Sequence, residues 1–283
     1  MLLLAEQSES DASPETLAIY AELRKLCGIP TVPLFYRHLA TIPGALEWVW
    51  AALAPVLRAG ILQKSAWAIT ESVKFENVAR LSNHTLSALG ITEADLTEFH
   101  KVLAVYDRSN PVTLLGLRYL GSLLRQRHRV AVIKSSSANL DSAWQPPAMI
   151  DDLLPMVKTA DVRGVTLRQM NVLTSRGEAS RASPLWPSLY RHLASRPALL
   201  SLTTLVVVPA FEAIDKAAES IRLEAEWRAN IFIETMEIAC NAARTSQQSQ
   251  QAITSAIDLF TDRLPELIAV VRLVIASIPE KAT

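Results

Sequence analysis

The chain has 283 residues, of which 50% are hydrophobic and only 8 are glycine. Its 28 Lys and Arg residues balance 28 Asp and Glu residues, so the formal net charge is zero, which argues against a nucleic-acid-binding protein with a basic face. Scarce glycine and abundant helix-forming residues predict an all-α protein that buries much of each helix.

The N-terminal region predicts a soluble, cytoplasmic chain. The first five residues are too few for the apolar core of a signal peptide, and acidic residues follow them. The longest apolar stretch, residues 199–211, contains Pro209 and is shorter than the roughly 20 residues that cross a membrane, so we expect a core helix there. Cys27 and Cys240 lack metal or redox spacing, which favours a reducing compartment without disulfides.

The first predicted helix has clear boundaries. It begins at Ser13-Pro14-Glu15, where an N-cap residue, a proline at N1 and an acid in the first turn follow one another, and it ends at Gly28. At the far end of this half, Asn110 precedes Pro111 and is expected to be the N-cap of a new helix. Hydrophobic periodicity predicts the remaining helices of this half over residues 32–41, 44–59 with a kink at Pro55, 65–78, 81–89, 93–107 and 111–124.

An internal repeat decides the predicted architecture. Tyr36-Arg37-His38-Leu39-Ala40 recurs as Tyr190-Arg191-His192-Leu193-Ala194, at an offset of 154 residues. We therefore expect two tandem helical copies, residues 1–124 and 148–283, joined by a linker over residues 125–147. Two fused copies usually pack about a pseudo-twofold axis, like a homodimer made covalent, and a ligand site would lie where the halves meet. The same offset aligns Pro55 with Pro209, Pro111 with Pro265 and Arg118 with Arg272.

Several motifs together resemble the group I DL-2-haloacid dehalogenases. Leu39-Ala40-Thr41-x-Pro43-Gly44, followed by a helix that contains tryptophans, is similar to the first repeat of that family. Asn110-Pro111 before an apolar helix resembles the family's Asn-Pro segment, and residues 149–157 resemble the start of its second half. Leu193-Ala194-x-x-Pro197 matches the corresponding helix of the second repeat. The resemblance covers most of the chain and is weakest in the linker.

The resemblance implies cofactor-free hydrolysis of 2-haloalkanoic acids of either hand, in a site between two helical repeats. In that reaction an Asp of the second repeat activates a water that an Asn of the first repeat helps to hold, and the water displaces halide at C2 with inversion. Asn110 matches the Asn. Leu189 stands at the position of the Asp, and residues 163–209 contain no Asp and a single carboxylate, Glu178. We therefore expect the parent activity to be lost or altered.

The histidines and arginines of the repeated motif have two interpretations. His38 and His192 could form a symmetric pair that binds an anion, shares a proton or holds a metal with further ligands, with His192 as a substitute for the missing base. Arg37 and Arg191 could recognise a carboxylate. The alternative is a packing motif in which Arg and His cap helix carbonyls. The candidate substrate-binding residues are Phe35, Tyr36, His38, Ser188, Tyr190 and Arg191.

Three functions are consistent with these patterns. The first is a diverged dehalogenase-type hydrolase, the second a protein that binds a small carboxylate with changed chemistry, and the third a non-catalytic helical scaffold that dimerises. The sequence has no phosphate-binding loop, nucleophile elbow or zinc signature, so we expect neither a cofactor nor a metal. The expected partners are a small carboxylate and a second copy of the chain, without nucleic acid or membrane.

Overall fold

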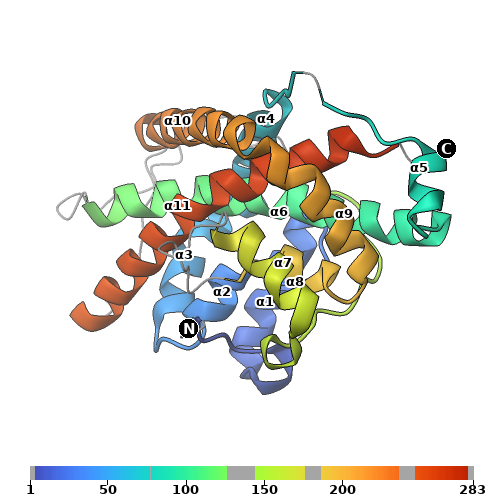
Figure 1. The fold of residues 1–283 in the computed structure, drawn as a ribbon. Helices are drawn as coiled ribbons and strands as arrows, with labels where there is room; N and C mark the ends of the chain where they lie inside the picture. Colours follow the sequence, from blue (N-terminus) through green and yellow to red (C-terminus); the bar gives the residue numbers. More distant parts are fainter. Residues whose placement is uncertain (1–3, 77, 126–143, 176–185, 236–245, 280–283) are drawn as a thin grey trace.

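The computed structural model describes residues 4–76, 78–125, 144–175, 186–235 and 246–279. Within these ranges all regular structure is helical and no strand occurs (Figure 1). The predicted all-α class is therefore confirmed. Most of the predicted linker lies outside the described residues. Glu178 and Cys240, in two other segments, also lie outside them.

The first part of the chain contributes one 3-10 helix and six α-helices. The predicted boundaries of the first α-helix are confirmed, because the Ser13 side chain accepts a hydrogen bond from the Thr16 amide and Gly28 ends the helix with φ of 63°. These elements are η1 (Glu9–Asp11), α1 (Pro14–Cys27), α2 (Leu34–Leu39), α3 (Ala45–Arg58), α4 (Ile61–Glu71), α5 (Asn83–Ala88) and α6 (Glu93–Arg125).

The second part contributes two 3-10 helices and five α-helices within the described residues. Helices α2 and α8 both have six residues and begin 154 residues apart, and α6 and α11 also begin 154 residues apart. The elements are η2 (Thr159–Asp161), α7 (Gly164–Ser175), α8 (Ser188–Leu193), α9 (Pro197–Val207), η4 (Val208–Ala210), α10 (Phe211–Thr235) and α11 (Gln247–Ser277).

Two predicted boundaries are wrong. The helix predicted over residues 65–78 is α4, which begins at Ile61 because Gly60, with φ of 70°, already separates it from α3. A Cβ at Gly60 would stand 2.2 Å from the Trp144 ring, so the described end of the predicted linker packs directly on this turn. The helix predicted to begin at Pro111 does not begin there, since α6 continues through it.

Proline interrupts α6 without ending it. Pro111 has no N–H to donate, but residues 109–117 are buried, so packing on both sides holds the helix together. The indole Nε1 of Trp67 donates a 3.1 Å hydrogen bond to the Arg108 carbonyl next to the break. Asn110 is consequently inside a helix and is not the N-cap that the sequence indicated. Helix α11 likewise continues through Pro265.

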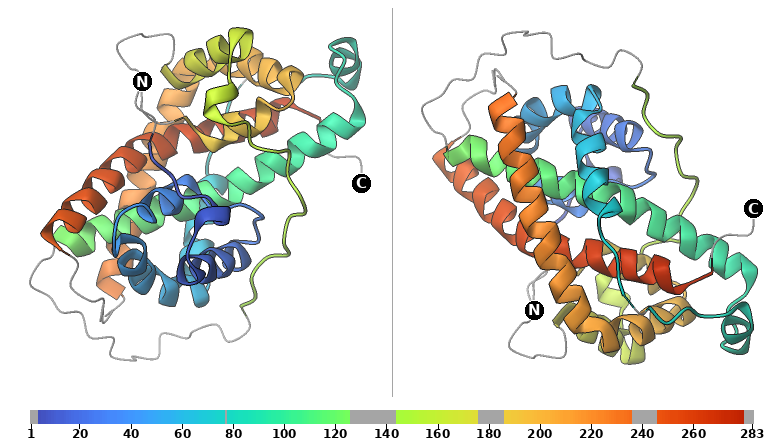
Figure 2. Two further views of the ribbon diagram at one scale, coloured as in Figure 1. Left: turned by 90° about the horizontal axis from the view of Figure 1, so that it is seen from below. Right: turned by 90° about the horizontal axis from the view of Figure 1, so that it is seen from above.

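The two long helices, α6 and α11, form the centre of the molecule. They lie side by side in opposite directions, as both views of Figure 2 show, and make the most extensive contact between any two helices. The short helix α2 packs on α11, whereas α8 packs on α6. Each short helix thus contacts the long helix from the other part of the chain, and α10 crosses both long helices on one face.

The apolar segment after Pro197 is only partly a core element. Residues Leu199, Leu200 and Leu202 of α9 are buried as predicted, but Leu205 is 59% exposed. By length and composition the stretch Pro197–Phe232 could cross a membrane. In its most apolar 18 residues, 33% are buried inside the protein. This is weak support for a span, because the core helix of a soluble protein meets the same criteria.

Candidate functional site

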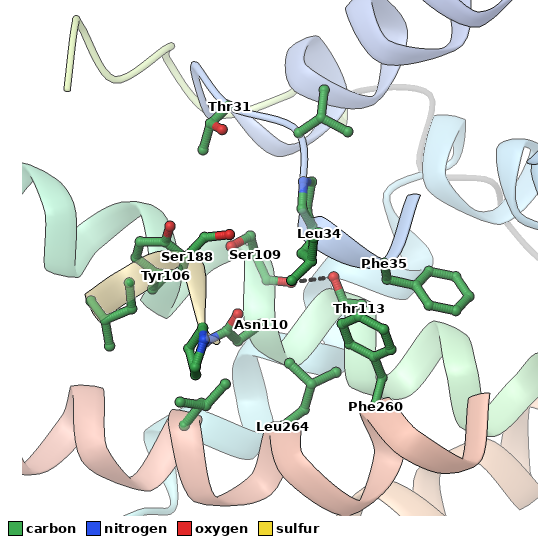
Figure 3. Close-up of a pocket in the computed structure, with 15 residues that line it drawn as sticks. Thr31, Leu34, Phe35, Tyr106, Ser109, Asn110, Thr113, Ser188, Phe260 and Leu264 are labelled. Carbon is green, nitrogen blue, oxygen red and sulfur yellow. Dashed lines mark hydrogen bonds between the residues drawn. The ribbon is translucent and has the colours of Figure 1, made fainter. Parts of the chain in front are cut away.

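A cavity opens where α2, α6, α8 and α11 converge (Figure 3). About 40 Å³ of it is open to the centres of water-sized molecules, which is about three times the minimum for one water and suits a ligand of a few non-hydrogen atoms. Both parts of the chain line it. The lining residues are Thr31, Val32, Pro33, Leu34, Phe35, Tyr106, Ser109, Asn110, Thr113, Pro187, Ser188, Leu189, Phe260, Leu264 and Leu267.

One side of the cavity is apolar. The Phe35 and Phe260 rings meet edge to face with centroids 5.4 Å apart, which joins α2 to α11. Leu264 and Leu189 extend this wall, and Leu189 is only 1% exposed. Such a surface accommodates an alkyl group or a halogen and excludes water from around it.

The other side of the cavity carries hydrogen-bonding groups. Figure 3 shows Tyr106, Ser109 and Ser188 gathered together, with Asn110 beneath them. Asn110 is 7% exposed, and its amide Nδ2 is buried without a hydrogen-bond partner among the described residues. The Thr113 hydroxyl donates to the Ser109 carbonyl at 2.8 Å and is therefore occupied within the helix. Asn110 thus supplies an uncommitted donor at the edge of the cavity.

Ser188 connects the cavity to a buried ionic cluster. It is the first residue of α8, and its Oγ accepts a 2.9 Å hydrogen bond from the Arg37 guanidinium. Tyr106 stands close by, and burial raises the pKa of its hydroxyl above the usual range, so the phenol stays protonated. Arg37 and a contact with Ser188 offset only part of that shift.

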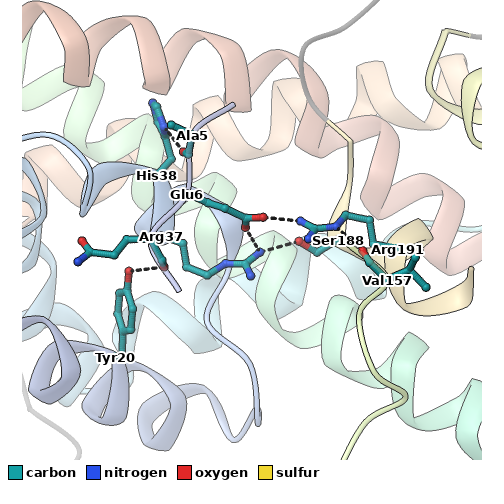
Figure 4. A network of polar contacts seen from close by, with 9 residues as sticks. Ala5, Glu6, Tyr20, Arg37, His38, Val157, Ser188 and Arg191 are labelled. Carbon is teal, nitrogen blue, oxygen red and sulfur yellow. Dashed lines mark hydrogen bonds and ion pairs between the residues drawn. The ribbon is translucent and has the colours of Figure 1, made fainter. Parts of the chain in front are cut away.

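The ionic cluster joins the N-terminal segment to both repeated motifs (Figure 4). One Glu6 oxygen lies 2.7 Å from Arg191 and the other lies 3.1 Å from Arg37. Each arginine side chain is only 9% exposed, whereas Glu6 is 27% exposed. Arg191 also donates from Nε to the Val157 carbonyl at 3.1 Å. Burial lowers the pKa of Arg37, and Glu6 partly restores it.

Each of the two histidines hydrogen-bonds a backbone carbonyl from an earlier part of the chain. His38 Nδ1 bonds the Ala5 carbonyl at 2.8 Å, and His192 Nδ1 bonds the Leu154 carbonyl at 2.5 Å. Because a carbonyl only accepts, Nδ1 carries the proton in both rings. Both carbonyls belong to segments outside the helices, so the histidines hold neighbouring loops and do not cap helix carbonyls. Among the described residues no group of three or more His, Cys, Asp or Glu side chains could hold a metal.

Burial lowers the pKa of His192 to about 4, so this ring is neutral at pH 7. Its Nε2 is buried and has no hydrogen-bond partner among the described residues. The ring packs against Tyr106 with centroids 6.0 Å apart, and Tyr106 in turn lines the cavity. His192 therefore lies behind the cavity wall.

Of the candidate residues, the structure brings Phe35, Asn110, Ser188 and Leu189 to the cavity. The remaining candidates are not among its lining residues: Tyr36, His38, Tyr190, Arg191 and His192. None of the described lining residues is Asp, Glu or His.

The sequence offered no signal for several residues that matter here. Glu6 has no motif around it and reaches its partners only through the fold. Tyr106 and Phe260 are 154 residues apart, the same offset as that of the Tyr-Arg-His-Leu-Ala motif, but this spacing does not indicate that both line one cavity.

Comparisons with known proteins bear on the fold. No protein-family model matches the chain, and no curated protein matches it. Solved structures of D-2-haloacid dehalogenases do match. A mutant in complex with D-2-CPA has a TM-score of 0.72 at 19% identity, covering 96% of this chain and 94% of that one. A second mutant structure has a TM-score of 0.74 at 18% identity, covering 98% and 96%.

A third structure, a D-2-haloacid dehalogenase with L-LA, has a TM-score of 0.73 at 18% identity and covers 96% of this chain and 95% of that one. The chain therefore has the fold of the D-2-haloacid dehalogenases over nearly its whole length. The relationship indicated by the sequence motifs is confirmed at the level of the fold.

Proposed function

We propose that the chain binds a small 2-substituted carboxylic acid in the cavity between α2, α6, α8 and α11. The observation that carries the proposal is the division of the cavity into an apolar wall and a side with donors. Phe35, Phe260 and Leu264 suit the substituent at C2, while the Asn110 amide and the Ser188 hydroxyl suit the carboxylate. The fold shared with the D-2-haloacid dehalogenases supports the same ligand class.

We propose further that the chain does not hydrolyse 2-haloacids by the parent route. A water nucleophile needs a base within hydrogen-bond reach, and the described lining residues include no carboxylate or imidazole. Leu189, at the position implied for the Asp, presents only methyl groups. His192 stands behind Tyr106 and is not among the lining residues, which argues against its replacing the carboxylate directly.

The repeat interpretation belongs to the same proposal. We infer that residues 1–124 and 148–283 are two tandem copies related by a pseudo-twofold axis. The matching starts of α2 and α8 and of α6 and α11, the antiparallel central helices, and the equivalent histidine contacts support it. The cavity would then be a site at the interface of a covalent pseudo-dimer.

Isothermal titration with 2-chloropropionate of each hand, together with a halide assay, tests the binding proposal. We expect saturable binding and halide release at least 10²-fold slower than a base-assisted reaction would give. Asn110→Ala should weaken binding, because it removes the buried donor. Asn83→Ala, at an exposed position on α5, is the matched control. Saturable binding that Asn110→Ala leaves unchanged would place the ligand elsewhere, and rapid halide release would show that the parent activity survives.

A second proposal concerns assembly. Leu223, Trp227 and Ile231 are 60%, 56% and 37% exposed and recur every four residues along α10, so they form one apolar stripe. Exposed stripes of this kind on a chain of zero net charge favour association. We propose that the chain forms a homodimer through this stripe.

A further inference from the structure

The hydroxyl of Ser188 has one proton, and the structure restricts where it can go. Its oxygen accepts a 2.9 Å hydrogen bond from the Arg37 guanidinium, and this bond uses one of the oxygen's lone pairs. The other contact of Ser188 among the described side chains is with the Tyr106 hydroxyl, which also lines the cavity. Because Ser188 lines the cavity as well, its O–H can turn from Tyr106 to donate to a ligand there.

The guanidinium makes this hydroxyl a better donor. A hydrogen bond from a charged group polarises the hydroxyl that accepts it, and the effect is larger where water is excluded. Arg37 is 9% exposed, so little water screens its charge. A carboxylate that accepts from Ser188 would therefore experience the positive charge of Arg37 through one intervening oxygen.

The fold fixes Arg37 in this position from three directions. Its backbone carbonyl accepts a 2.9 Å hydrogen bond from the Gln7 amide. Its guanidinium lies 3.1 Å from a Glu6 carboxylate oxygen and donates a 2.9 Å hydrogen bond to Ser188 (Figure 4). The other Glu6 oxygen is held by Arg191 at 2.7 Å, and Arg191 is anchored to the Val157 carbonyl. Movement of the Arg37 guanidinium away from Ser188 would thus disturb its ion pair with Glu6.

The charges of the cluster do not cancel. Two guanidinium groups share one carboxylate, and Glu6 is the only acidic side chain that pairs with either arginine in the described residues. The neutral phenol of Tyr106 adds no charge. One positive charge therefore remains beside a cavity whose described lining is uncharged, and an anionic ligand would balance it.

We propose that Arg37 is a positioning residue for carboxylate recognition: held by Glu6 and Arg191, it orients and polarises the Ser188 hydroxyl toward the carboxylate of the bound acid. The proposal rests on the proposed function, because it assumes a small carboxylic acid in the cavity. Arg37, which does not line the cavity, would then make the site prefer a charged acid over a neutral analogue.

The test compares a charged and a neutral probe of nearly the same shape, 2-chloropropionate and 2-chloropropionamide, by isothermal titration. Wild type should prefer the carboxylate. Arg37→Met should reduce this preference by about tenfold, the equivalent of one charge-assisted hydrogen bond, with a much smaller change for the amide. Ser188→Ala should also reduce the preference for the carboxylate. Because this substitution is small, the variant should fold and can be measured even if Arg37→Met does not fold.

Arg24→Met is the matched control, since it removes the same charge from a neighbouring pair with Glu9 and leaves Glu6, Arg191 and the bond between Arg37 and Ser188 in place. We expect it to reduce the preference clearly less than Arg37→Met does. An equal reduction would overturn the proposal in favour of a diffuse effect of charge. A wild-type preference retained in both Arg37→Met and Ser188→Ala would overturn it as well. Absence of binding of either probe to the wild type would instead reject the proposed function on which it rests.

Discussion

Leu189 is 1% exposed and faces a cavity whose described lining contains Asn110 but no group that could accept a proton from water at neutral pH. Asn110 keeps a buried amide without a partner there. Under the proposed function, Asn110 would hold a water, and no described lining residue would deprotonate it. The proposal therefore predicts that a carboxylate at position 189 would add hydrolysis to binding.

Leu189→Asp should introduce measurable dehalogenation of 2-chloropropionate. Desolvation would raise the pKa of the new carboxyl, so halide release should increase with pH as the group ionises. Burial of the charge should also lower the free energy of unfolding by about 2–4 kcal/mol. A halide assay across pH measures the gain, with Leu189→Asn as the neutral control. A folded Leu189→Asp variant that binds the acid but releases no halide would contradict this prediction.

His192 gives the fold a dependence on pH. Its pKa falls from 6.5 in the unfolded chain to about 4 in the folded one, so between these values the unfolded state binds more protons. The stability due to the neutral ring is present above pH 6.5 and is lost as pH falls toward 4, by about 3 kcal/mol in total. Urea unfolding of wild type and His192→Gln at pH 7.5 and 5 should show a smaller loss in the variant.

The corresponding control is His38→Gln, at the more exposed histidine that bonds the Ala5 carbonyl. It should leave the difference between the two pH values close to that of wild type. An equal loss of stability on acidification in wild type and His192→Gln would show that other groups dominate this pH range.

At the scale of elements, the N-terminal segment that carries Glu6 is a structural part of the molecule. Ala5, Glu6 and Gln7 each bond to the motif helix α2 through His38 or Arg37, and Glu6 extends to α8 through Arg191. The segment therefore joins the two short helices that flank the cavity.

Glu6→Gln should lower the free energy of unfolding by about 2 kcal/mol, because it leaves two buried guanidinium groups without their shared counter-charge. The estimate is below the value for a fully buried pair because Glu6 is 27% exposed. Glu9→Gln is the matched control. Its pair with Arg24 is 39% and 30% exposed, so its loss should cost less than about 1 kcal/mol. Equal losses in urea unfolding would argue against the bridging role.

The sequence predicted elements well where their signals are local and poorly where packing decides. Ser13, Pro14 and Gly28 define both ends of α1 because capping depends on neighbouring residues. Pro111 suggested a helix start, yet α6 passes through it because buried contacts outweigh one missing hydrogen bond. Asn110 was assigned to the site by resemblance and does line the cavity. Glu6 was missed because its partners are 31 and 185 residues away along the chain.

At the scale of the whole molecule, the exposed stripe on α10 has a testable consequence. Trp227→Glu should convert the proposed homodimer to a monomer, because it places a charge at the centre of the stripe formed with Leu223 and Ile231. Sedimentation velocity measures the change. Leu89→Glu, at a 50% exposed leucine after α5, is the control and should leave the assembly intact. A wild-type chain that sediments as a monomer would contradict the proposal.

The bridge from Glu6 to Arg191 also bears on how the chain is made. Glu6 is synthesised 185 residues before Arg191. Until α8 emerges, Glu6 can pair with Arg37 but not with Arg191. Contacts between such distant residues form late in folding because a long loop must close first. The cluster beside the cavity therefore becomes complete only after both halves have been translated, so a truncated product that ends in the linker would lack a finished binding site.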